Sequence, residues 1–294
     1  MIVVLNLTLL LLCSSIWGRP QDVQPLERDL IPERFIKARP AKPSAPRSRR
    51  ISYRRVNSSS SGKAGPKSAT QLGLTIWRLR RATAAEVGER IIVQDNGQTV
   101  EWVPERVEAG RPLRIGEKIR ISFESQQAGY LYVINREQYA SGALGEPLLI
   151  FPTTRTRNGE NRVAAGRLIE IPAQDDRPNF FTMRQTRMDQ VGEQLIALVT
   201  PQPLTDLTIT EKPLRLTDEV VSKWEQEWGA KTERFEMATG GGKAWTKVEQ
   251  EAGANAAHQL TQDDPGPQTI FRIAAGPDQP RLIKVILRYV TRPQ

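Results

Sequence analysis

The chain has 294 residues, a formal net charge of +9, one histidine and one cysteine, Cys13. This length allows one large or two small domains. If the segment that holds Cys13 is removed, the mature chain has no cysteine, which excludes disulfides and the zinc sites built from cysteines or from two histidines.

The charge is unevenly distributed. Residues 19–72 carry 13 Lys and Arg against 4 Asp and Glu, whereas residues 73–294 carry 29 of each kind. The basic excess therefore belongs to one segment, which argues against a basic nucleic-acid footprint across a folded domain.

Residues 2–17 form an apolar run that is shorter than the roughly 18–20 residues needed to span a bilayer and is typical of a secretory signal. We predict residues 1–18 to be a signal peptide, with cleavage points at Ser14, Ser15 and Gly18, and hence an exported, periplasmic or extracellular protein. Because no Lys or Arg precedes the run, an uncleaved membrane anchor and a cytoplasmic protein stay open as alternatives. Lipidation of Cys13 is disfavoured by the bulky Leu11 and Leu12 before it.

Residues 19–72 are rich in Pro, Arg, Lys and Ser and lack apolar spacing. Such a segment buries too little surface to offset its ordering entropy, so we predict a disordered basic tether. Its functional interpretation is contact with an anionic surface or polymer, centred on Arg47, Arg49, Arg50, Arg54 and Arg55. A solvated linker is favoured, because Tyr53 is the only aromatic residue among these arginines that could stack on bases.

Residues 73–294 are predicted to form a single β-rich domain. In chain order, the expected strands lie around residues 74–79, 91–93, 99–103, 118–123, 129–135, 148–151, 167–171, 194–199, 268–273 and 282–290. The segment 118–123 is expected to bury Ile119, Ile121 and Phe123 on one face, and Tyr130 and Tyr132 should face away from Leu131 and Val133. The almost wholly apolar 194–199 is expected to be central in a sheet. Many short strands with Gly and Pro at nearly every junction predict a mainly β, antiparallel sandwich, immunoglobulin-like or related.

One or two short helices are expected in the C-terminal third of the chain. Thr217 can cap a helix that Gly229 ends, with Val220, Trp224 and Trp228 on one face. The tryptophans are interpreted as an anchor on a sheet, with a ligand-binding shelf as the alternative.

Several weak motifs in the centre of the chain follow one another in a recognisable order. They include Arg114-Ile115-Gly116-Glu117, Gly129-Tyr130-Leu131-Tyr132-Val133, Leu149-Ile150-Phe151-Pro152 and Gly192-Glu193-Gln194-Leu195. Residues of about 107–205 thereby resemble the bacterial domain-of-unknown-function family 4384. The resemblance implies an exported, mainly β module and supplies no catalytic residues.

No candidate for chemistry survives comparison with a structural interpretation. His258 is the sole histidine and is expected at the surface. Gly240-Gly241-Gly242-Lys243 has the wrong spacing for a phosphate loop. The pairs Asp175-Asp176 and Asp263-Asp264 are candidate carboxylates or calcium ligands, but each lies close to a proline and is explained by turn chemistry. We therefore predict no catalytic, cofactor-binding or metal site.

Three functional hypotheses follow from the sequence. The first is a non-enzymatic envelope module that binds a protein or polymer partner. The second is a hydrolase that uses a pair of Asp or Glu side chains, since such a pair needs neither His nor Cys. The third is salt-sensitive binding of an anionic polymer by residues 19–72.

Overall fold

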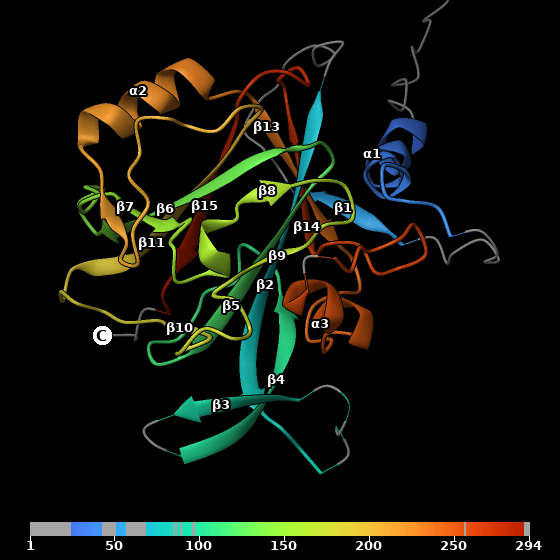
Figure 1. Ribbon diagram of the computed structural model, residues 1–294, viewed down its shortest axis with the longest axis horizontal. Coiled ribbons are helices and arrows are strands. Elements are labelled where there is room, and N and C mark those ends of the chain that lie inside the picture. The colour runs from blue at the N-terminus through green and yellow to red at the C-terminus, as the bar shows by residue number, and fades with distance from the viewer. Residues whose placement is uncertain are drawn as a thin grey trace, which may run out of the picture.

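The computed structural model describes residues 25–42, 51–56, 69–84, 86, 88, 90–95, 98–255 and 257–290. Two antiparallel sheets pack face to face in it (Figure 1), so the prediction of a mainly β, antiparallel sandwich is confirmed. The predicted signal peptide, residues 1–18, lies outside the described residues. Within the described part, no helix is long and apolar enough to cross a membrane.

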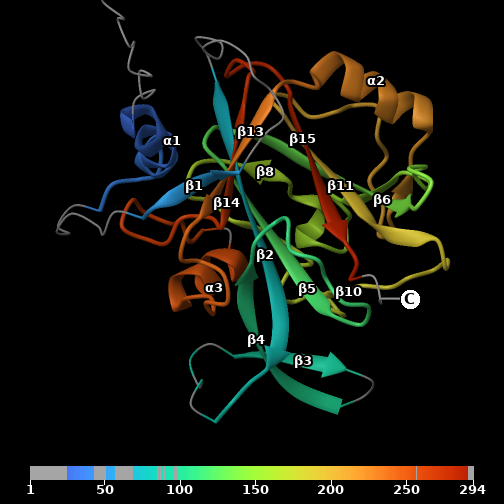
Figure 2. The ribbon, with the colours of Figure 1, turned by 180° about the vertical axis from the view of Figure 1, so that it is seen from behind.

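The first sheet is built around β2, which pairs with β14 and β4 along one side and with β5 along the other. Its strands are β1 (Tyr53–Val56), β13 (Thr232–Met237), β14 (Thr269–Ile273), β2 (Thr70–Arg81), β4 (Gln98–Val107) and β3 (Ile91–Asp95) in this order, with β9 (Ile169–Ile171) and β10 (Phe181–Thr182) joined to β5 (Lys118–Ser125). The expected strands of residues 91–93 and 99–103 belong to β3 and β4, which pair as an antiparallel hairpin that projects from the sandwich (Figures 1 and 2). Residues 96 and 97 between them lie outside the described part.

The second sheet is built around β6 and β11, which pair along almost their whole length. Its order is β12 (Leu214–Arg215), β7 (Leu148–Phe151), β6 (Gly129–Tyr139), β11 (Gln190–Thr200) and β15 (Arg281–Arg288), and β8 (Arg162–Val163) pairs with the start of β6; η1 (Arg157–Gly159) is a short 3₁₀ turn. The interior position of β11 confirms the prediction made from its apolar sequence.

The main core lies between the two sheets. Leu131 and Val133 of β6 face it, while Tyr132 and Ile134 face the opposite side of the second sheet, as the alternation predicted. The first sheet contributes Ile119, Ile121 and Phe123, which are at most 2% exposed.

Helix α2 (Asp218–Trp228) covers the outer face of the second sheet (Figure 1). Thr217 Oγ1 accepts a hydrogen bond from the backbone N–H of Val220, and Gly229 ends the helix, as predicted. Trp224 and Trp228 stack with their ring centroids 5.7 Å apart and pack against the apolar cluster beneath the helix. The anchor interpretation therefore describes these tryptophans, although Val221 and not Val220 is the fully buried residue.

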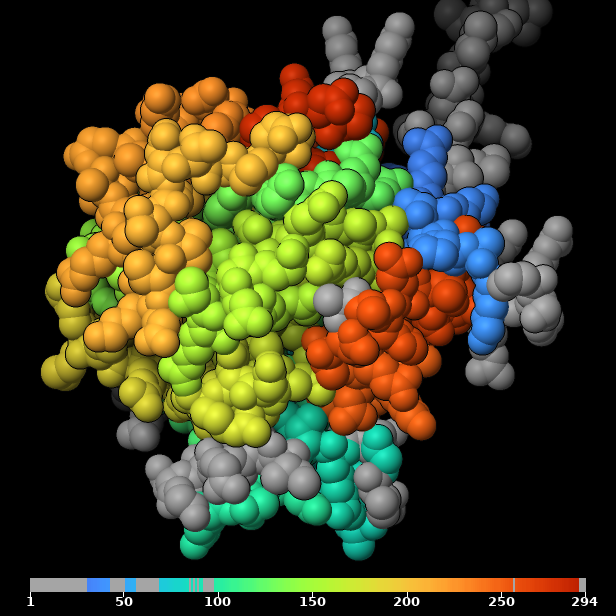
Figure 3. Space-filling model, viewed as in Figure 1, coloured from blue at the N-terminus to red at the C-terminus, as the bar shows by residue number. Residues whose placement is uncertain are grey.

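The prediction of a disordered tether over residues 19–72 is wrong for residues 25–42, 51–56 and 69–72, the last of which include the buried start of β2. Helix α1 (Pro25–Lys37) and strand β1 are part of the fold, and in Figure 3 the blue N-terminal segment lies against the orange-red segment that contains α3 (Lys247–Ala254). Phe35 and Tyr53 supply the missing apolar surface, because both are buried against Phe235 and Ile270 of β13 and β14. Isolated apolar residues thus order a segment whose average composition is polar.

The outer face of the first sheet is a buried layer of charged side chains. Arg39 pairs with Glu124 at 2.7 Å, Arg120 pairs with Glu170 at 2.8 Å, and Arg106 pairs with Glu249 of α3. The alternation of β5 was read correctly for its apolar face, but its charged face is buried as well. Glu249 of α3, Glu170 of β9 and Arg39 after α1 supply the partners that make this burial possible, and the backbone carbonyls of residues 261, 264 and 265 accept from Arg39.

Candidate functional site

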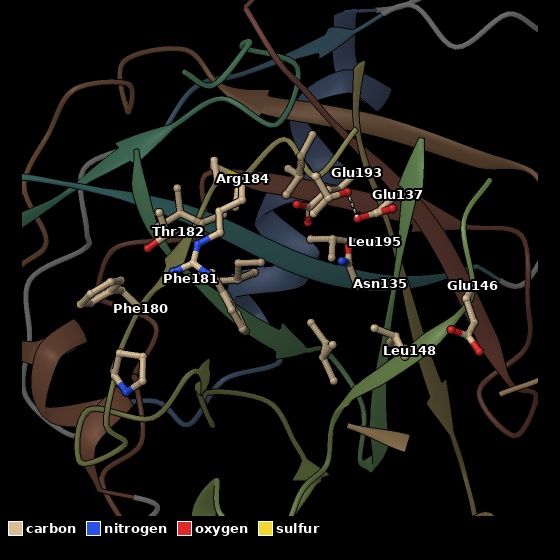
Figure 4. Close-up of a pocket in the computed structure, with 17 residues that line it drawn as sticks. Asn135, Glu137, Glu146, Leu148, Phe180, Phe181, Thr182, Arg184, Glu193 and Leu195 are labelled. Atoms are coloured by element: carbon tan, nitrogen blue, oxygen red, sulfur yellow. Dashed lines mark hydrogen bonds between the residues drawn. The ribbon is translucent and has the colours of Figure 1, made fainter. Parts of the chain in front are cut away.

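A pocket of about 500 Å³ lies between the two sheets, lined by both inner faces (Figure 4). Its apolar wall combines side chains of β5, β7, β11 and β15, namely Ile119, Ile121, Leu148, Ile150, Leu195 and Leu287. Phe180, Phe181 and Thr182 form the side opposite the carboxylates of Glu137 and Glu193, which lie next to each other in Figure 4. The pocket is therefore apolar in its walls and acidic along one side.

The polar side of the pocket continues the core-facing columns of the second sheet. On β6 the core-facing residues are Leu131, Val133, Asn135 and Glu137. On β11 the core-facing Glu193 comes two residues before the core-facing Leu195. Because alternate residues of a strand share a face, these polar side chains occupy positions that the rest of the sheet fills with aliphatic residues. Carboxylates on the inner face of a sandwich call for a specific explanation.

Glu137 and Glu193 are directly opposite each other in the β6–β11 ladder. Directly opposed residues of an antiparallel pair have Cβ atoms about 4.5–5.5 Å apart, and two like charges at such positions are destabilising. Glu137 accepts hydrogen bonds from Tyr139 Oη and Thr186 Oγ1, both at 2.6 Å. Within the described part of the chain, no Lys, Arg or His nitrogen lies within 4.0 Å of either carboxylate.

Tyr289 connects Glu193 to the backbone through one hydroxyl. Its Oη lies 2.7 Å from Glu193 Oε1 and 2.8 Å from the carbonyl oxygen of Arg184. A hydroxyl has one proton, so it can donate to only one of these acceptors. If Tyr289 donates to the Arg184 carbonyl, a protonated Glu193 can donate to Tyr289, and every short contact is then a hydrogen bond.

The surroundings of Glu193 act on its protonation in opposite directions. Burial raises the pKa of Glu193 above its ordinary value, and the charge of Glu137 adds to the rise, while hydrogen bonds from Tyr289 and Asn135 oppose it. Burial and the neighbouring Glu193 also raise the pKa of Tyr289.

The other charged residues around the pocket are more exposed. Glu146 pairs with Arg215 at 2.5 Å, with half of its side chain open to solvent. Arg184 is exposed on the opposite wall, and Arg187 lies over the Tyr139 ring at 4.4 Å and pairs with Asp189. The half-buried acidic groups of the pocket are therefore Glu137 and Glu193.

Replacing Glu193 by Gln is expected to stabilise the protein at pH 8 by up to about 1 kcal/mol, because it removes one of two opposed like charges. A carboxyl group whose pKa is raised on folding contributes stability below its unfolded pKa of about 4.3, and this contribution is lost as pH rises through the folded pKa. The advantage of Glu193→Gln should thus grow from pH 4 to pH 8 in urea unfolding. The matched change Glu146→Gln should show no such growth, and equal pH profiles for both variants would contradict the assignment.

The aspartates considered as candidate site residues from the sequence lie outside the pocket, and they stabilise turns of the fold. Asp176 accepts hydrogen bonds from the Ala173 N–H at 2.9 Å and from Thr156 Oγ1 at 2.6 Å. Asp264 accepts from both the N–H and the hydroxyl of Thr261. Turn chemistry therefore describes both aspartates, as the sequence indicated.

The remaining nominated residues are also outside the pocket. His258 follows α3, with its side chain 40% exposed and Nε2 4.0 Å from Glu251. The glycines of residues 240–242 form a turn between β13 and α3. Arg54 and Arg55 pair with Glu108 and Glu233 at 2.6 and 2.5 Å, whereas Arg47, Arg49 and Arg50 lie outside the described residues. The described residues contain no group of three or more His, Cys, Asp or Glu side chains able to hold a metal ion.

Glu137 and Glu193 were not predicted because the two expected strands were too short at the ends that carry these residues. The expected strands stopped at residue 135 and started at residue 194, while β6 extends to Tyr139 and β11 begins at Gln190. The signal was present: continuing the period-two alternation by one step puts both glutamates on the core-facing side.

Comparison with known families confirms the resemblance seen in the central motifs. Residues 112–203 match the family described as "Domain of unknown function (DUF4384)", about a third of the chain. Searches of curated proteins and of solved structures each found no match. The matched segment runs from just before β5 to just after β11, and it contains every pocket-lining residue named above except Leu287.

Proposed function

We propose that this chain, which carries a DUF4384 domain over residues 112–203, is an exported, non-enzymatic module that binds a protein partner in the bacterial envelope. The observation that supports binding is the pocket between the sheets, with aliphatic walls and two carboxylates on core-facing positions. Concave sites with apolar walls and a few convergent polar groups are the usual form of a ligand site. Export is proposed from the apolar run of residues 2–17.

A photo-crosslinking amino acid placed at Thr182, inside the pocket, tests this proposal in intact cells. We expect a discrete adduct from Thr182 that disappears when Glu137 and Glu193 are both changed to Gln. The matched position is Ser222, an exposed residue of α2 on the outer face of the second sheet, which should give no such adduct. Identical adducts from both positions, or an adduct that survives the double change, would contradict binding at the pocket.

The same cells test the proposed location. We expect the mature chain outside the cytoplasm, with an N-terminus near Arg19. A full-length chain recovered only from the cytoplasm would overturn export and leave the pocket assignment standing.

A carboxylate-dependent hydrolase is the second candidate, and the opposition of Glu137 and Glu193 across the ladder favours it specifically. A glutamic acid with a raised pKa beside a second carboxylate is the arrangement that acid–base hydrolysis of a glycoside requires. Purified protein should then cleave an envelope glycan, with at least about a 100-fold loss for Glu193→Gln and no loss for Glu146→Gln. The binding proposal expects no turnover from any of these proteins.

A further inference from the structure

We propose that the pocket recognises a cationic group on an apolar stem, the side chain of a lysine or arginine presented by the protein partner, and that Glu137 and Glu193 receive the cation in exchange for a proton. This inference rests on the proposed function, since it names the chemistry of the ligand in the same pocket.

The shape and lining of the pocket suit an aliphatic stem. Ile121, Leu195 and Leu287 come from three different strands and line the pocket together with Leu148 of β7. Lysine and arginine carry three or four methylene groups that pack on apolar surface while the charged head reaches a polar partner. A cavity of about 500 Å³ has room for such a side chain.

The two carboxylates on the acidic side of the pocket have no ion-pair partner among the described residues. Glu146 is already paired with Arg215, and Arg184 on the opposite wall is exposed. Glu137 and Glu193 face each other without a cation within 4.0 Å among the described residues. An ammonium or guanidinium group between them would form charge-assisted hydrogen bonds with both and convert their mutual repulsion into attraction.

The side chain next to the pair does not neutralise it. Asn135 precedes Glu137 by two residues on the same strand and face and is directly opposite Leu195 in the ladder. It is an uncharged amide that hydrogen-bonds with Glu193, so the negative charge of the pair is left for a ligand to balance. A positively charged donor group fits this set of groups better than a carboxylate or a phosphate would.

Binding should be coupled to proton release. In the proposed exchange, Glu193 carries a proton in the ligand-free protein, which reduces its repulsion with Glu137 directly opposite in the ladder. Burial raises the pKa of Glu193, which acts in the same direction. When the cation enters, that proton leaves to solvent, Glu193 becomes ionised, and the pair carries two negative charges beside the ligand's positive charge. Because the cation binds the ionised pair, its affinity should rise with pH, and Glu193, Glu137, Glu146, Tyr289 and Arg184 are the titratable or charged groups that face the site.

Titration of the full chain with n-hexylammonium chloride, followed by amide NMR shifts at Thr182 and Thr186, tests the inference directly. We expect saturable binding at about millimolar concentration that weakens at least about tenfold from pH 8 to pH 5. An alkylammonium group has a pKa near that of lysine, about 10.4, so it stays charged throughout and the change reports on the protein. Changing Glu137 and Glu193 together to Gln should weaken binding at least about tenfold, and Glu193→Gln alone should remove the pH dependence. The control Glu211→Gln, at an exposed position that does not line the pocket, should retain both the affinity and its pH dependence.

Neutral n-hexanol and CaCl₂ are the two comparison ligands. Equal binding of hexanol and hexylammonium would overturn the cationic ligand and leave a pocket that binds apolar groups. Tighter binding of Ca²⁺ than of hexylammonium at the same shifted residues would replace it with a metal site. No shift with any of the three, in a protein that gives the Thr182 adduct in cells, would overturn the cationic ligand alone; without that adduct, the proposed function fails too.

Discussion

Replacing Arg39 by Ala is expected to lower the free energy of unfolding by about 3–5 kcal/mol, because it leaves a buried carboxylate without its partner. The Arg39 guanidinium donates to both oxygens of Glu124 at 2.7 Å and to the backbone carbonyls of Thr261, Asp264 and Pro265. Its side chain is fully buried, and that of Glu124 is 2% exposed. One arginine thus joins the segment after α1 to the first sheet and to the connection before β14.

Urea unfolding of the full chain measures this effect, with Lys37→Ala as the matched control. Lys37 lies two residues away and pairs with Glu33 at 3.8 Å with its side chain 71% exposed. A surface pair of this kind contributes about 0.3–0.5 kcal/mol. If Arg39→Ala costs no more than Lys37→Ala, the N-terminal segment is a tether after all and its docking on the sheet is wrong.

Replacing Arg120 by Met is expected to cost a similar amount, about 3–5 kcal/mol, while changing Glu170 to Leu as well should recover most of the loss. Arg120 and Glu170 are at most 1% exposed and pair at 2.8 Å on neighbouring strands β5 and β9. Arg120 also donates to the carbonyl of Asn179, and Glu170 accepts from Gln174 Nε2. Removing one member leaves a buried charge, whereas removing both leaves an apolar contact.

A double-mutant cycle by urea unfolding distinguishes these cases. We expect a coupling energy of about 2–3 kcal/mol between the two positions. Additive single changes would show that water or other groups satisfy these charges, and would contradict the buried ionic layer on the outer face of the first sheet.

The sequence predicted the sandwich because its strands carry the period-two pattern on the core side, as in residues 119–123 and 131–134 of β5 and β6. The burial of Arg39, Arg120 and Glu124 could not be predicted. Charged residues in a polar segment, or on the polar face of an alternating strand, normally face solvent. Their burial depends on partners that are 50 and 85 residues apart in sequence. For the same reason α1 and β1 escaped notice: Phe35 and Tyr53 gain a core only when β13 and β14 are in place.

The candidate site was predictable in part. The motif of residues 192–195 included Glu193, and the ordering of motifs identified the family segment that contains most of the pocket. The opposition of Glu137 and Glu193 depends on the register between β6 and β11, which no single segment reveals. The carboxylate pairs considered from the sequence, Asp175-Asp176 and Asp263-Asp264, lie outside the pocket, where the opposed carboxylates are Glu137 and Glu193.

The titration of the Glu193 side-chain carboxyl, followed by ¹³C NMR with and without saturating n-hexylammonium, tests the central claim most directly. We predict that the group titrates above the ordinary value of about 4.3 in the free protein and that the cation lowers its pKa. Glu211, an exposed residue that does not line the pocket, serves as the internal reference, and the cation should leave its carboxyl signal unchanged. A Glu193 that titrates at its ordinary value, unchanged by the cation, would contradict a pocket that exchanges a proton for a positively charged ligand.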